Sequence, residues 1–305
     1  MELYESLEQA AAAPSTARPA VCLGNFDGVH LGHQALFAQA RALGPVFAVT
    51  FDPHPGKVLQ PQLAPRLIAT RARKLELLGE AGVAATVVQP FTREYARTSP
   101  EAFEATLLDG LRAAAVVVGY DFTYGQARAG TVASLSDAAA KRGAVVRVVP
   151  AVTVDGVVVS SSKVREYVLE GRVDTAARLL GRPFDLDGTV VTGQQRGRTI
   201  GFPTANVDTD NELRPASGVY AVRARLEGGR VFGGAANIGV KPTFEGRDVT
   251  IECHLFDFSG DLYGQRVRVS FLERLRGEQR FAGVEALKAQ IERDVLAARA
   301  IVNRG

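Results

Sequence analysis

The segment CLGNFDGVHLGHQALF, residues 22–37, has residue types and spacing that suit it to holding a phosphate. Gly24 and Gly28 bracket a short loop that follows an apolar strand, and a helix is expected to begin near His33. The first N–H groups of a helix are unpaired and carry partial positive charge, so they bind phosphate well. The imidazoles of His30 and His33 can donate hydrogen bonds to oxygens that gain charge in a transition state. The segment therefore predicts an ATP-phosphate site.

Two other interpretations of the histidine pair stay open. His30 and His33 could cap the loop as structural residues, or they could ligate a metal ion. A metal site would need a third ligand and a partner group that orients the ligands. Gly32 leaves the backbone between the two histidines free of a side chain, which favours both facing one phosphate group.

The segment SSSKVR, residues 160–165, is a second candidate anion site. Serines are favourable at a helix N-terminus. Lys163 and Arg165 are not, because the helix dipole disfavours cations there. A bound polyphosphate would remove that mismatch, and a solvated basic turn is the alternative interpretation.

The segment GTVVTGQQRGRTIGFPTANV, residues 188–207, can also surround phosphates. Its regularly spaced glycines and the arginines between them are Gly193, Gly197, Gly201, Arg196 and Arg198. Backbone amides and guanidinium groups both bind phosphate, although the Gly-Lys-Ser/Thr of a Walker motif is missing. Thr204 and Asn206 point to the same side of an extended chain, and their oxygens suit Mg²⁺. The alternative is a glycine-rich barrel corner with a Thr/Asn turn.

The run VTIECHLFDF contains the most interesting acid of the second half. Strand alternation places Glu252 and His254 on the face opposite Cys253. A carboxylate on a rigid strand can accept the proton of an alcohol that attacks ATP. Glu252 could also simply face solvent, as most strand glutamates do.

The first half of the chain alternates between strand-like and helix-like segments. The predicted strands are 20–23, 46–51, 85–88, 114–119 and 145–149, all expected to be buried, and the predicted helices are 33–43, 67–78, 101–111 and 134–142. This alternation predicts right-handed βαβ crossovers and a doubly wound parallel sheet, an α/β fold. Ligands of such sheets bind beyond the carboxyl ends of the strands, which is where the first phosphate segment lies.

The pattern changes after Gly181-Arg182-Pro183. Two short helices, 162–170 and 174–180, precede this point, and the β-like runs after it are 188–192, 218–226, 231–238, 249–258 and 266–271. Runs separated by Gly, Pro and Asp predict an antiparallel β-barrel, with a sandwich as the alternative. The apolar face of an expected terminal helix, 284–299, comprises Leu287, Ile291, Val295 and Leu296. We therefore expect domains at 1–183 and 184–305.

Bulk composition excludes several classes of protein. A chain of 305 residues suits two domains, and 46% apolar with 23% charged residues is typical of soluble globular proteins. No apolar run approaches the roughly 20 residues that span a bilayer, and the acidic N-terminus is unlike a secretory signal, so we expect a cytoplasmic protein. A net charge of +3 without a basic block gives little support for nucleic-acid binding. Cys22 and Cys253 lie in apolar runs and are expected to be buried thiols.

Several motifs resemble one known family. HLGH at 30–33 resembles the HxGH signature of the nucleotidyltransferase superfamily, and residues 160–165 are similar to its second phosphate loop. With FDPHP at 51–55, which alone would be only a turn, and VGYDFTYG at 118–125, the string GNFDGVHLGH resembles the FAD synthetase module of the bacterial bifunctional riboflavin kinase/FAD synthetases.

That resemblance implies roles for residues of the first domain. The expected catalytic residues are His30, His33 and Arg165. The residues expected to bind ATP or its phosphates are Gly24, Asn25, Asp27, Arg128, Ser160, Ser161 and Ser162. Asp121 and Phe122 are expected on the flavin side or elsewhere in the lining of the pocket. Thr123 and Tyr124 stand where the family usually has Arg and Phe.

GRTIGFPTAN, GVYAV, ANIGVKPTF and HLFDFSGDLYG resemble the riboflavin kinase module of the same family, a small β-barrel. The resemblance implies transfer of the ATP γ-phosphate to the riboflavin 5′-hydroxyl. It assigns Thr204 and Asn206 to Mg²⁺-ATP and Glu252 to the catalytic base. The residues it assigns to ATP phosphate are Gly197 and Arg198. Lys241 stands where the family usually has Arg, so the charge is kept while the bidentate fork is lost.

With both modules present, the resemblance covers nearly the whole chain. It implies a bifunctional enzyme that makes FMN from riboflavin and ATP, then FAD and pyrophosphate from FMN and ATP. The expected partners are riboflavin, FMN, FAD and ATP, with no nucleic acid and no membrane, and the sequence does not indicate an oligomeric state. Two alternatives stay open: an adenylyltransferase of another phosphorylated acceptor with a non-catalytic barrel, and a nucleotide- or flavin-binding regulator without catalysis.

Overall fold

The structure is a computed structural model that describes residues 1–13, 18–193, 201–243 and 246–304, and the side chains of residues 240–248 lie outside this description. The described chain forms two compact units. The first comprises Met1–Arg66 and Arg71–Ser160, and the second comprises Leu67–Thr70 and Ser161–Gly305. Residues 161–183 therefore group with the second unit by their contacts, whereas the sequence pattern places them in the first domain.

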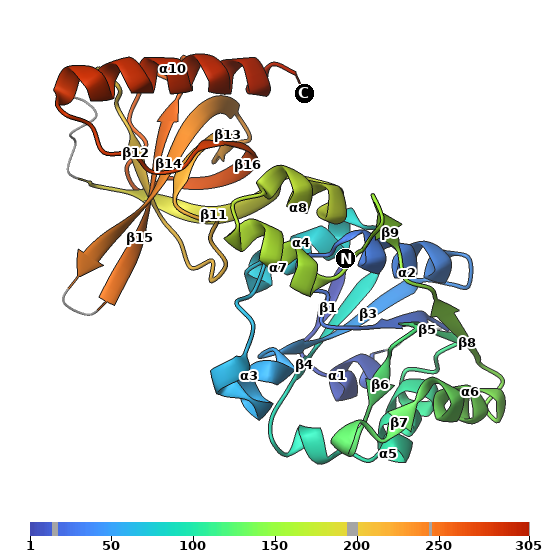
Figure 1. Ribbon diagram of the computed structural model, residues 1–305. Coiled ribbons are helices and arrows are strands. Elements are labelled where there is room, and N and C mark those ends of the chain that lie inside the picture. Colours follow the sequence, from blue (N-terminus) through green and yellow to red (C-terminus); the bar gives the residue numbers. More distant parts are fainter. Residues whose placement is uncertain (14–17, 194–200, 244–245, 305) are drawn as a thin grey trace. The chain divides into compact units, whose positions relative to one another are not determined.

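The first unit is built on a six-stranded parallel sheet in the order β1-β4-β3-β2-β5-β8 (Figure 1). Its strands are β1 (Glu2–Tyr4), β2 (Ala20–Leu23), β3 (Val46–Asp52), β4 (Ala85–Pro90), β5 (Ala115–Gly119) and β8 (Val145–Val149). This confirms the predicted α/β class. The chain leaves β2 toward β3 on one side and later returns beside it as β5, so the topological switch point lies between β2 and β5. Ligands of doubly wound sheets bind at that point.

The two edge strands depart from the sequence prediction. Residues 145–149 were expected to be buried, but β8 pairs only with β5, and the side chains of Val145 and Val148 are 48% and 45% exposed. The other edge strand, β1, pairs with β4 and was not predicted. A strand of three residues is too short to show an alternating pattern.

The predicted helices lie at nearly the predicted places: they are α2 (Leu31–Arg41), α4 (Arg71–Glu80), α5 (Pro100–Ala105), which continues as a π-helical turn (Thr106–Gly110), and α6 (Val132–Ala140). Helices α1 (Leu7–Ala12) and α3 (Pro55–Leu59) were not predicted. Short 3-10 turns lie at Pro61–Leu63, Tyr95–Arg97 and Gln126–Arg128, and two small hairpins pair β6 (Thr123–Tyr124) with β7 (Gly130–Thr131) and β9 (Thr153–Val154) with β10 (Val157–Val158). Side-chain caps fix several helix starts: the Thr131 hydroxyl, for example, accepts the Ser134 N–H at the start of α6.

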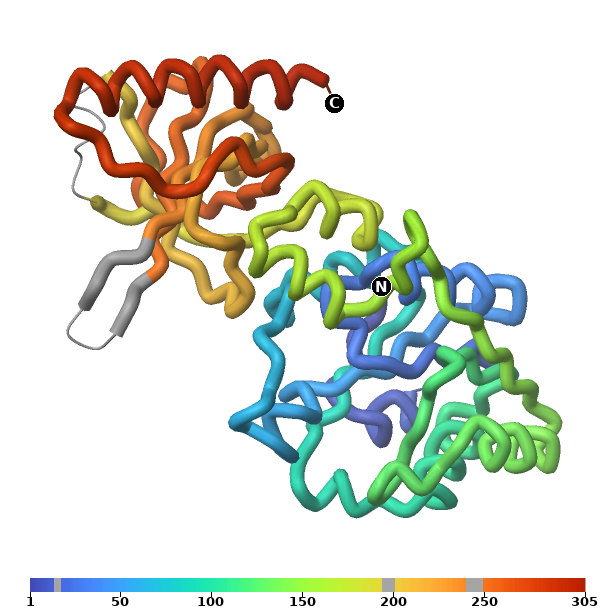
Figure 2. Tube along the Cα trace, in the orientation of Figure 1, coloured from blue at the N-terminus to red at the C-terminus, as the bar shows by residue number. Residues whose placement is uncertain are grey.

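The second unit begins with a helical pair, α7 (Ser161–Leu169) and α8 (Val173–Leu180). Gly181, with a φ of 73°, ends α8 in the left-handed conformation that glycine adopts without strain. Helix α8 packs on the barrel strands β11 and β16. Arg274 of β16 also donates to the Glu170 carbonyl oxygen after α7, at 3.4 Å. Helix α8 and the turn after α7 therefore contact the barrel, which the pair precedes in the trace of Figure 2.

The rest of the second unit is a closed antiparallel barrel in the order β11-β12-β15-β14-β13-β16. The strands are β11 (Phe184–Val191), β12 (Ala205–Asp208), β13 (Gly218–Leu226), β14 (Val231–Thr243), β15 (Gly246–Leu255) and β16 (Arg266–Arg276). Pairing of β11 with β16 closes the barrel, with Phe184 opposite Phe271. The structure thus confirms the predicted barrel, which leaves no exposed sheet edge.

The terminal helix α10 (Val284–Val302) lies across β13, β14 and β16 (Figure 1). The prediction placed Leu296 on its apolar face, but that side chain is 69% exposed. The buried face continues instead through Ala298, which is fully buried. Steps of three and four residues from Val295 lead to Ala298 and Val302, whereas Leu296 lies about 100° away around the helix. No helix in the described ranges is long and apolar enough to cross a membrane.

Candidate active sites

The loop between β2 and α2 has a strained backbone that buried side chains hold in place. Phe26, Gly28 and Val29 have φ values of 48°, 79° and 42°. A non-glycine residue in this region costs of order 1–3 kcal/mol. The strain is sustained because Phe26 and Val29 are buried, and the Phe26 ring packs 5.0 Å from the Phe37 ring. Such over-determined strain is common where a loop must present its backbone to a ligand.

The structure brings His30 and His33 together. Their rings stack with centroids 3.6 Å apart and an interplanar angle of 16°. His30 is also the N-cap of α2, because its Nδ1 accepts the His33 N–H at 3.3 Å, which leaves the ring proton of a neutral His30 on Nε2. A Cβ on Gly32 would lie 3.1 Å from two atoms of the His30 ring, so glycine gives this ring its room. The capping role and the phosphate role are thus compatible.

His33 is held as a neutral imidazole. Burial lowers the pKa of His33 well below its ordinary value, and the charges of His30 and Lys74 lower it further. Its Nδ1 is buried and has no hydrogen-bond partner among the described residues. Across the same residues, no cluster of three or more His, Cys, Asp or Glu side chains could hold a metal. The metal interpretation of the histidine pair therefore finds no third ligand of these types there.

A lysine that sequence reasoning missed lies beside this loop. Lys74 of α4 donates from Nζ to the Thr50 hydroxyl at 3.2 Å, and that hydroxyl donates to the Asn25 carbonyl oxygen at 3.0 Å. Burial lowers the pKa of Lys74, and the carboxylates of Asp27 and Asp52 oppose that shift. Asp27 is 4% exposed. The predicted pocket residues Asn25 and Asp27 thus share their surroundings with a buried cation.

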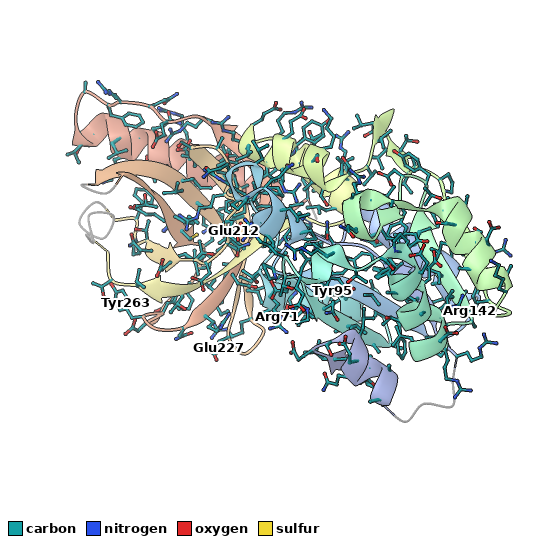
Figure 3. All side chains as sticks on the ribbon, turned by 90° about the horizontal axis from the view of Figure 1, so that it is seen from below. Arg71, Tyr95, Arg142, Glu212, Glu227 and Tyr263 are labelled. Carbon is teal, nitrogen blue, oxygen red and sulfur yellow. The ribbon has the colours of Figure 1, made fainter. Side chains whose placement is uncertain are left out.

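Three aromatic side chains gather at the carboxyl ends of β3 and β4, and we call them the aromatic cluster: Phe51, Phe91 and Tyr95. The ring of Phe51 lies 5.5 Å from that of Phe91 and 6.1 Å from that of Tyr95. The Tyr95 hydroxyl (Figure 3) is buried and, in the described part of the chain, has no hydrogen-bond partner. Burial raises the pKa of Tyr95, so the hydroxyl keeps its proton and remains a donor. The sequence analysis named Phe51 only as part of FDPHP and did not single out Phe91 or Tyr95, because aromatic side chains at strand ends are typical of a core.

On the other side of β2, the residues after β5 include the predicted Asp121, Phe122 and Arg128. Asp121 is exposed, and Phe122 stacks on Tyr124 with ring centroids 5.7 Å apart. Arg128 has a φ of 59°, and its Nε donates to the Thr123 hydroxyl at 2.8 Å. Thr123, which stands where the family usually has arginine, therefore orients the side chain of Arg128.

The serine segment spans the division between the two units. Ser160 ends the first unit, and Ser161, Ser162 and Arg165 belong to α7 in the second. The Lys163 ammonium pairs with Glu166 at 2.7 Å. Cations are unfavourable at a helix N-terminus, and the sequence suggested that a polyphosphate compensates for Lys163 and Arg165 there. The ion pair with Glu166 already compensates for part of that charge.

In the barrel, Glu252 of β15 lies opposite Asn206 of β12 and opposite Asn237 of β14. Gly193 passes so close to Asn206 that a Cβ at Gly193 would lie 2.1 Å from the amide nitrogen of Asn206. Thr204 immediately precedes β12. Gly197 and Arg198 lie outside the described residues, as does the side chain of Lys241.

Two cavities meet at Thr204. The α10 cavity, about 620 Å³, lies between the barrel and α10. Its lining includes Phe202, Asn237, Glu252, His254, Phe281 and Leu287. The loop cavity, about 540 Å³, lies beneath the β15–β16 connection, where its lining includes Pro203, Ala205, Cys253 and Leu262 as well as Tyr263 (Figure 3). Thr204 lines both cavities. Cys253 and Cys22 are buried free thiols, as predicted.

Comparison with known proteins accounts for both halves of the chain. The FAD synthetase family profile matches residues 13–163, and the riboflavin kinase profile matches residues 180–302. The bifunctional riboflavin kinase/FMN adenylyltransferase of Pseudomonas fluorescens is 42% identical over 92% of this chain and 91% of its own, and that of Haemophilus influenzae is 37% identical over 93% and 94%. A crystal structure of a Streptococcus pneumoniae protein described as a macrolide-efflux protein matches with a TM-score of 0.89 and 32% identity, covering 97% of this chain and 98% of that one. This chain belongs to the family of bifunctional riboflavin kinase/FMN adenylyltransferases.

Proposed function

We propose that the barrel phosphorylates riboflavin to FMN and that the first unit adenylylates FMN to FAD, with ATP consumed in both steps. The observation that carries this proposal is that each unit has its own reactive constellation: the stacked His30–His33 pair at the start of α2, and Glu252 beside a cavity in the barrel. An adenylyltransferase with a non-catalytic barrel is not favoured, because the riboflavin kinase profile spans the barrel. A cytoplasmic location, where ATP is made and used, belongs to the same proposal.

In the kinase site, riboflavin occupies the α10 cavity and ATP the loop cavity. Phe202, Phe281 and Leu287 supply flat and apolar surface for the flavin rings, and Asn237 supplies a polar group. Glu252 accepts the proton of the riboflavin 5′-hydroxyl as that oxygen attacks the γ-phosphorus, and the bond to the β–γ bridging oxygen breaks to release ADP. The reacting groups meet at Thr204, which borders both cavities.

The barrel residues also fit Mg²⁺. The Thr204 hydroxyl, the Asn206 amide oxygen and the nearby Glu252 carboxylate form an all-oxygen donor set, the type that Mg²⁺ prefers. Thr204 and Asn206 would hold the ion, and Gly197 with Arg198 would hold the phosphates. When bound, Mg²⁺ supplies positive charge that neutralises the phosphate oxygens.

In the adenylyltransferase site, the start of α2 holds the ATP phosphates. His30 and His33 donate hydrogen bonds to them, Arg165 with Ser160, Ser161 and Ser162 binds the triphosphate, and Gly24, Asn25 and Asp27 line the loop. A phosphate oxygen of FMN attacks the α-phosphorus, and pyrophosphate leaves. The FMN phosphate is already ionised near neutral pH, since the second pKa of such groups is about 6, so this step needs no general base. Positioning and charge stabilisation suffice.

We place the flavin of FMN against the aromatic cluster. Phe51, Phe91 and Tyr95 offer three rings, and the buried Tyr95 hydroxyl keeps a proton to donate. Asp121 and Phe122 line the pocket on the other side of β2, where Arg128 serves the ATP. This arrangement puts the two substrates on opposite sides of the switch-point strand.

The decisive experiment separates the two activities in one chain. Purified protein is incubated with riboflavin, ATP and Mg²⁺, and FMN and FAD are quantified by chromatography. We expect the double variant His30→Ala/His33→Ala to make FMN without FAD. We expect Glu252→Ala to make no FMN from riboflavin yet to convert supplied FMN to FAD. If either variant lost both activities while its circular dichroism stayed native, the two-site assignment would be wrong.

A further inference from the structure

The segment that carries Thr204 is only partly held by strand pairing. Backbone pairing of β12 with β15 joins Ala205 to Cys253 and Asn206 to Glu252, and β12 begins at Ala205. Thr204 therefore lies just before the paired strand, although it borders both cavities. Pro203 has no N–H group, so its carbonyl oxygen is the only polar backbone group by which it can be held.

His254 holds that carbonyl group. Its Nδ1 lies 2.8 Å from the Pro203 carbonyl oxygen. Since a carbonyl oxygen only accepts, Nδ1 carries the proton and donates it. The imidazole is packed edge-on between two rings, with centroids 5.6 Å from that of Phe202 and 5.9 Å from that of Phe256. The bond from His254 continues the link between the two strands beyond the end of their backbone pairing.

We propose that His254 is a positioning residue for phosphoryl transfer, which fixes the Thr204 hydroxyl between the two cavities by anchoring the Pro203 carbonyl group. Thr204 is held from one side by the pairing at Ala205 and from the other by His254. The inference rests on the proposed function, since it takes Thr204 and Glu252 as parts of the kinase site. It gives His254 no part in the chemistry itself.

Side-chain geometry provides a sharp test. The Nδ2 of asparagine and the Nδ1 of histidine both bond to Cγ, so His254→Asn can still donate to the Pro203 oxygen. His254→Gln places its nitrogen one atom farther out, near the position of Nε2, and His254→Ala has no donor. We expect His254→Ala and His254→Gln to lower kcat for FMN formation by about tenfold or more, the size expected for one lost hydrogen bond. His254→Asn should recover most of kcat, and the KM for riboflavin should change little between the Asn and Gln variants.

The second activity of the same chain is the internal control. FAD formation from supplied FMN should be unchanged in all three variants, and circular dichroism of each variant checks that its barrel is folded. Thr204→Ala and Glu252→Ala are measured alongside. If these two leave FMN formation intact, the proposed kinase site itself is wrong. If they abolish it while His254→Ala and His254→Gln keep the wild-type kcat, only the role of His254 is overturned. If the Asn variant is as slow as the Ala variant, the Nδ1 bond is not the cause.

Discussion

Single side chains near β2 show how burial tunes the charges of the proposed phosphate site. His33 stays neutral because its ring is buried and stacked on His30. Burial also lowers the pKa of Lys74, but the carboxylate of Asp27 opposes that shift and favours the charged ammonium group. Two fixed positive charges next to each other would repel. The arrangement instead combines the cation of Lys74 with the neutral imidazole of His33, which can donate a hydrogen bond to an arriving phosphate.

His33 should make the folding stability depend on pH. In the unfolded chain its pKa returns to about 6.5, whereas the folded pKa lies well below. Below about pH 6.5 the unfolded chain takes up a proton that the fold refuses, so the free energy of unfolding should decrease as the pH falls. The slope approaches 1.4 kcal/mol per pH unit at most, and the effect vanishes above that pH. Urea unfolding from about pH 7.5 to about pH 5.5 should show a weaker dependence in His33→Asn, and equal slopes in the two proteins would contradict this account.

Lys74 should matter for FAD formation alone. Replacing it with methionine keeps most of the buried stem but removes the charge beside Asn25 and Asp27, where the phosphates are proposed to bind. We expect Lys74→Met to lower kcat for FAD formation by about 100-fold, the range measured for fixed electrostatic groups. FMN formation should stay unchanged. Lys141→Met, at an exposed lysine of the same unit, is the matched control. A Lys74→Met protein with wild-type FAD formation would remove Lys74 from the site.

Among helices and strands, the sequence predicted apolar runs with clear ends, and among site residues it predicted those that lie close together along the chain. Strand β2 has the predicted bounds because it is an unbroken apolar run between Pro19 and Gly24, and β8 because its four valines around Arg147 lie between Gly143 and Pro150. β12 was missed because its four residues, Ala205–Asp208, form neither an apolar run nor a clear alternation. His30 and His33 were found by their spacing, since a helix N-terminus brings such residues together locally. Lys74 and Tyr95 were not, because a helical lysine resembles a solvated one and only the fold brings α4 beside the loop after β2.

The β11–β12 connection makes a prediction about a glycine. A Cβ on Gly193 would meet the Asn206 side chain at about 2 Å, so Gly193→Ala must displace the proposed Mg²⁺ ligand. We expect FMN formation to fall by tenfold or more, with a higher Mg²⁺ requirement, while FAD formation from FMN is unchanged. Gly283→Ala is the control, because a Cβ there meets nothing within 4 Å. Wild-type Mg²⁺ dependence in Gly193→Ala would remove Asn206 from the metal site.

At the scale of the whole molecule, residues 161–183 belong with the barrel by their contacts. Leu179 and Leu180 of α8 are buried, and α8 packs on β11 and β16. Each such leucine contributes roughly 1.5–3 kcal/mol when buried. A fragment of residues 161–305 should therefore be more stable than one of residues 184–305 by several kcal/mol. Urea unfolding of the two fragments checks this, and equal midpoints with equal slopes would show that the helical pair adds nothing to the barrel.

The division at Ser160 also bears on how such chains are inherited. Helix α7 carries Ser161, Ser162 and Arg165, which we assign to adenylyl transfer, yet it belongs to the barrel's unit and packs on α8, which in turn packs on β11 and β16. A recombination event that exchanged barrels at residue 183 would part α8 from β11 and β16 and leave its buried leucines facing a foreign surface. An exchange at residue 160 would keep the helical pair on its own barrel, but it would carry half of the adenylylation machinery along. The two activities are therefore expected to descend together, as one heritable unit.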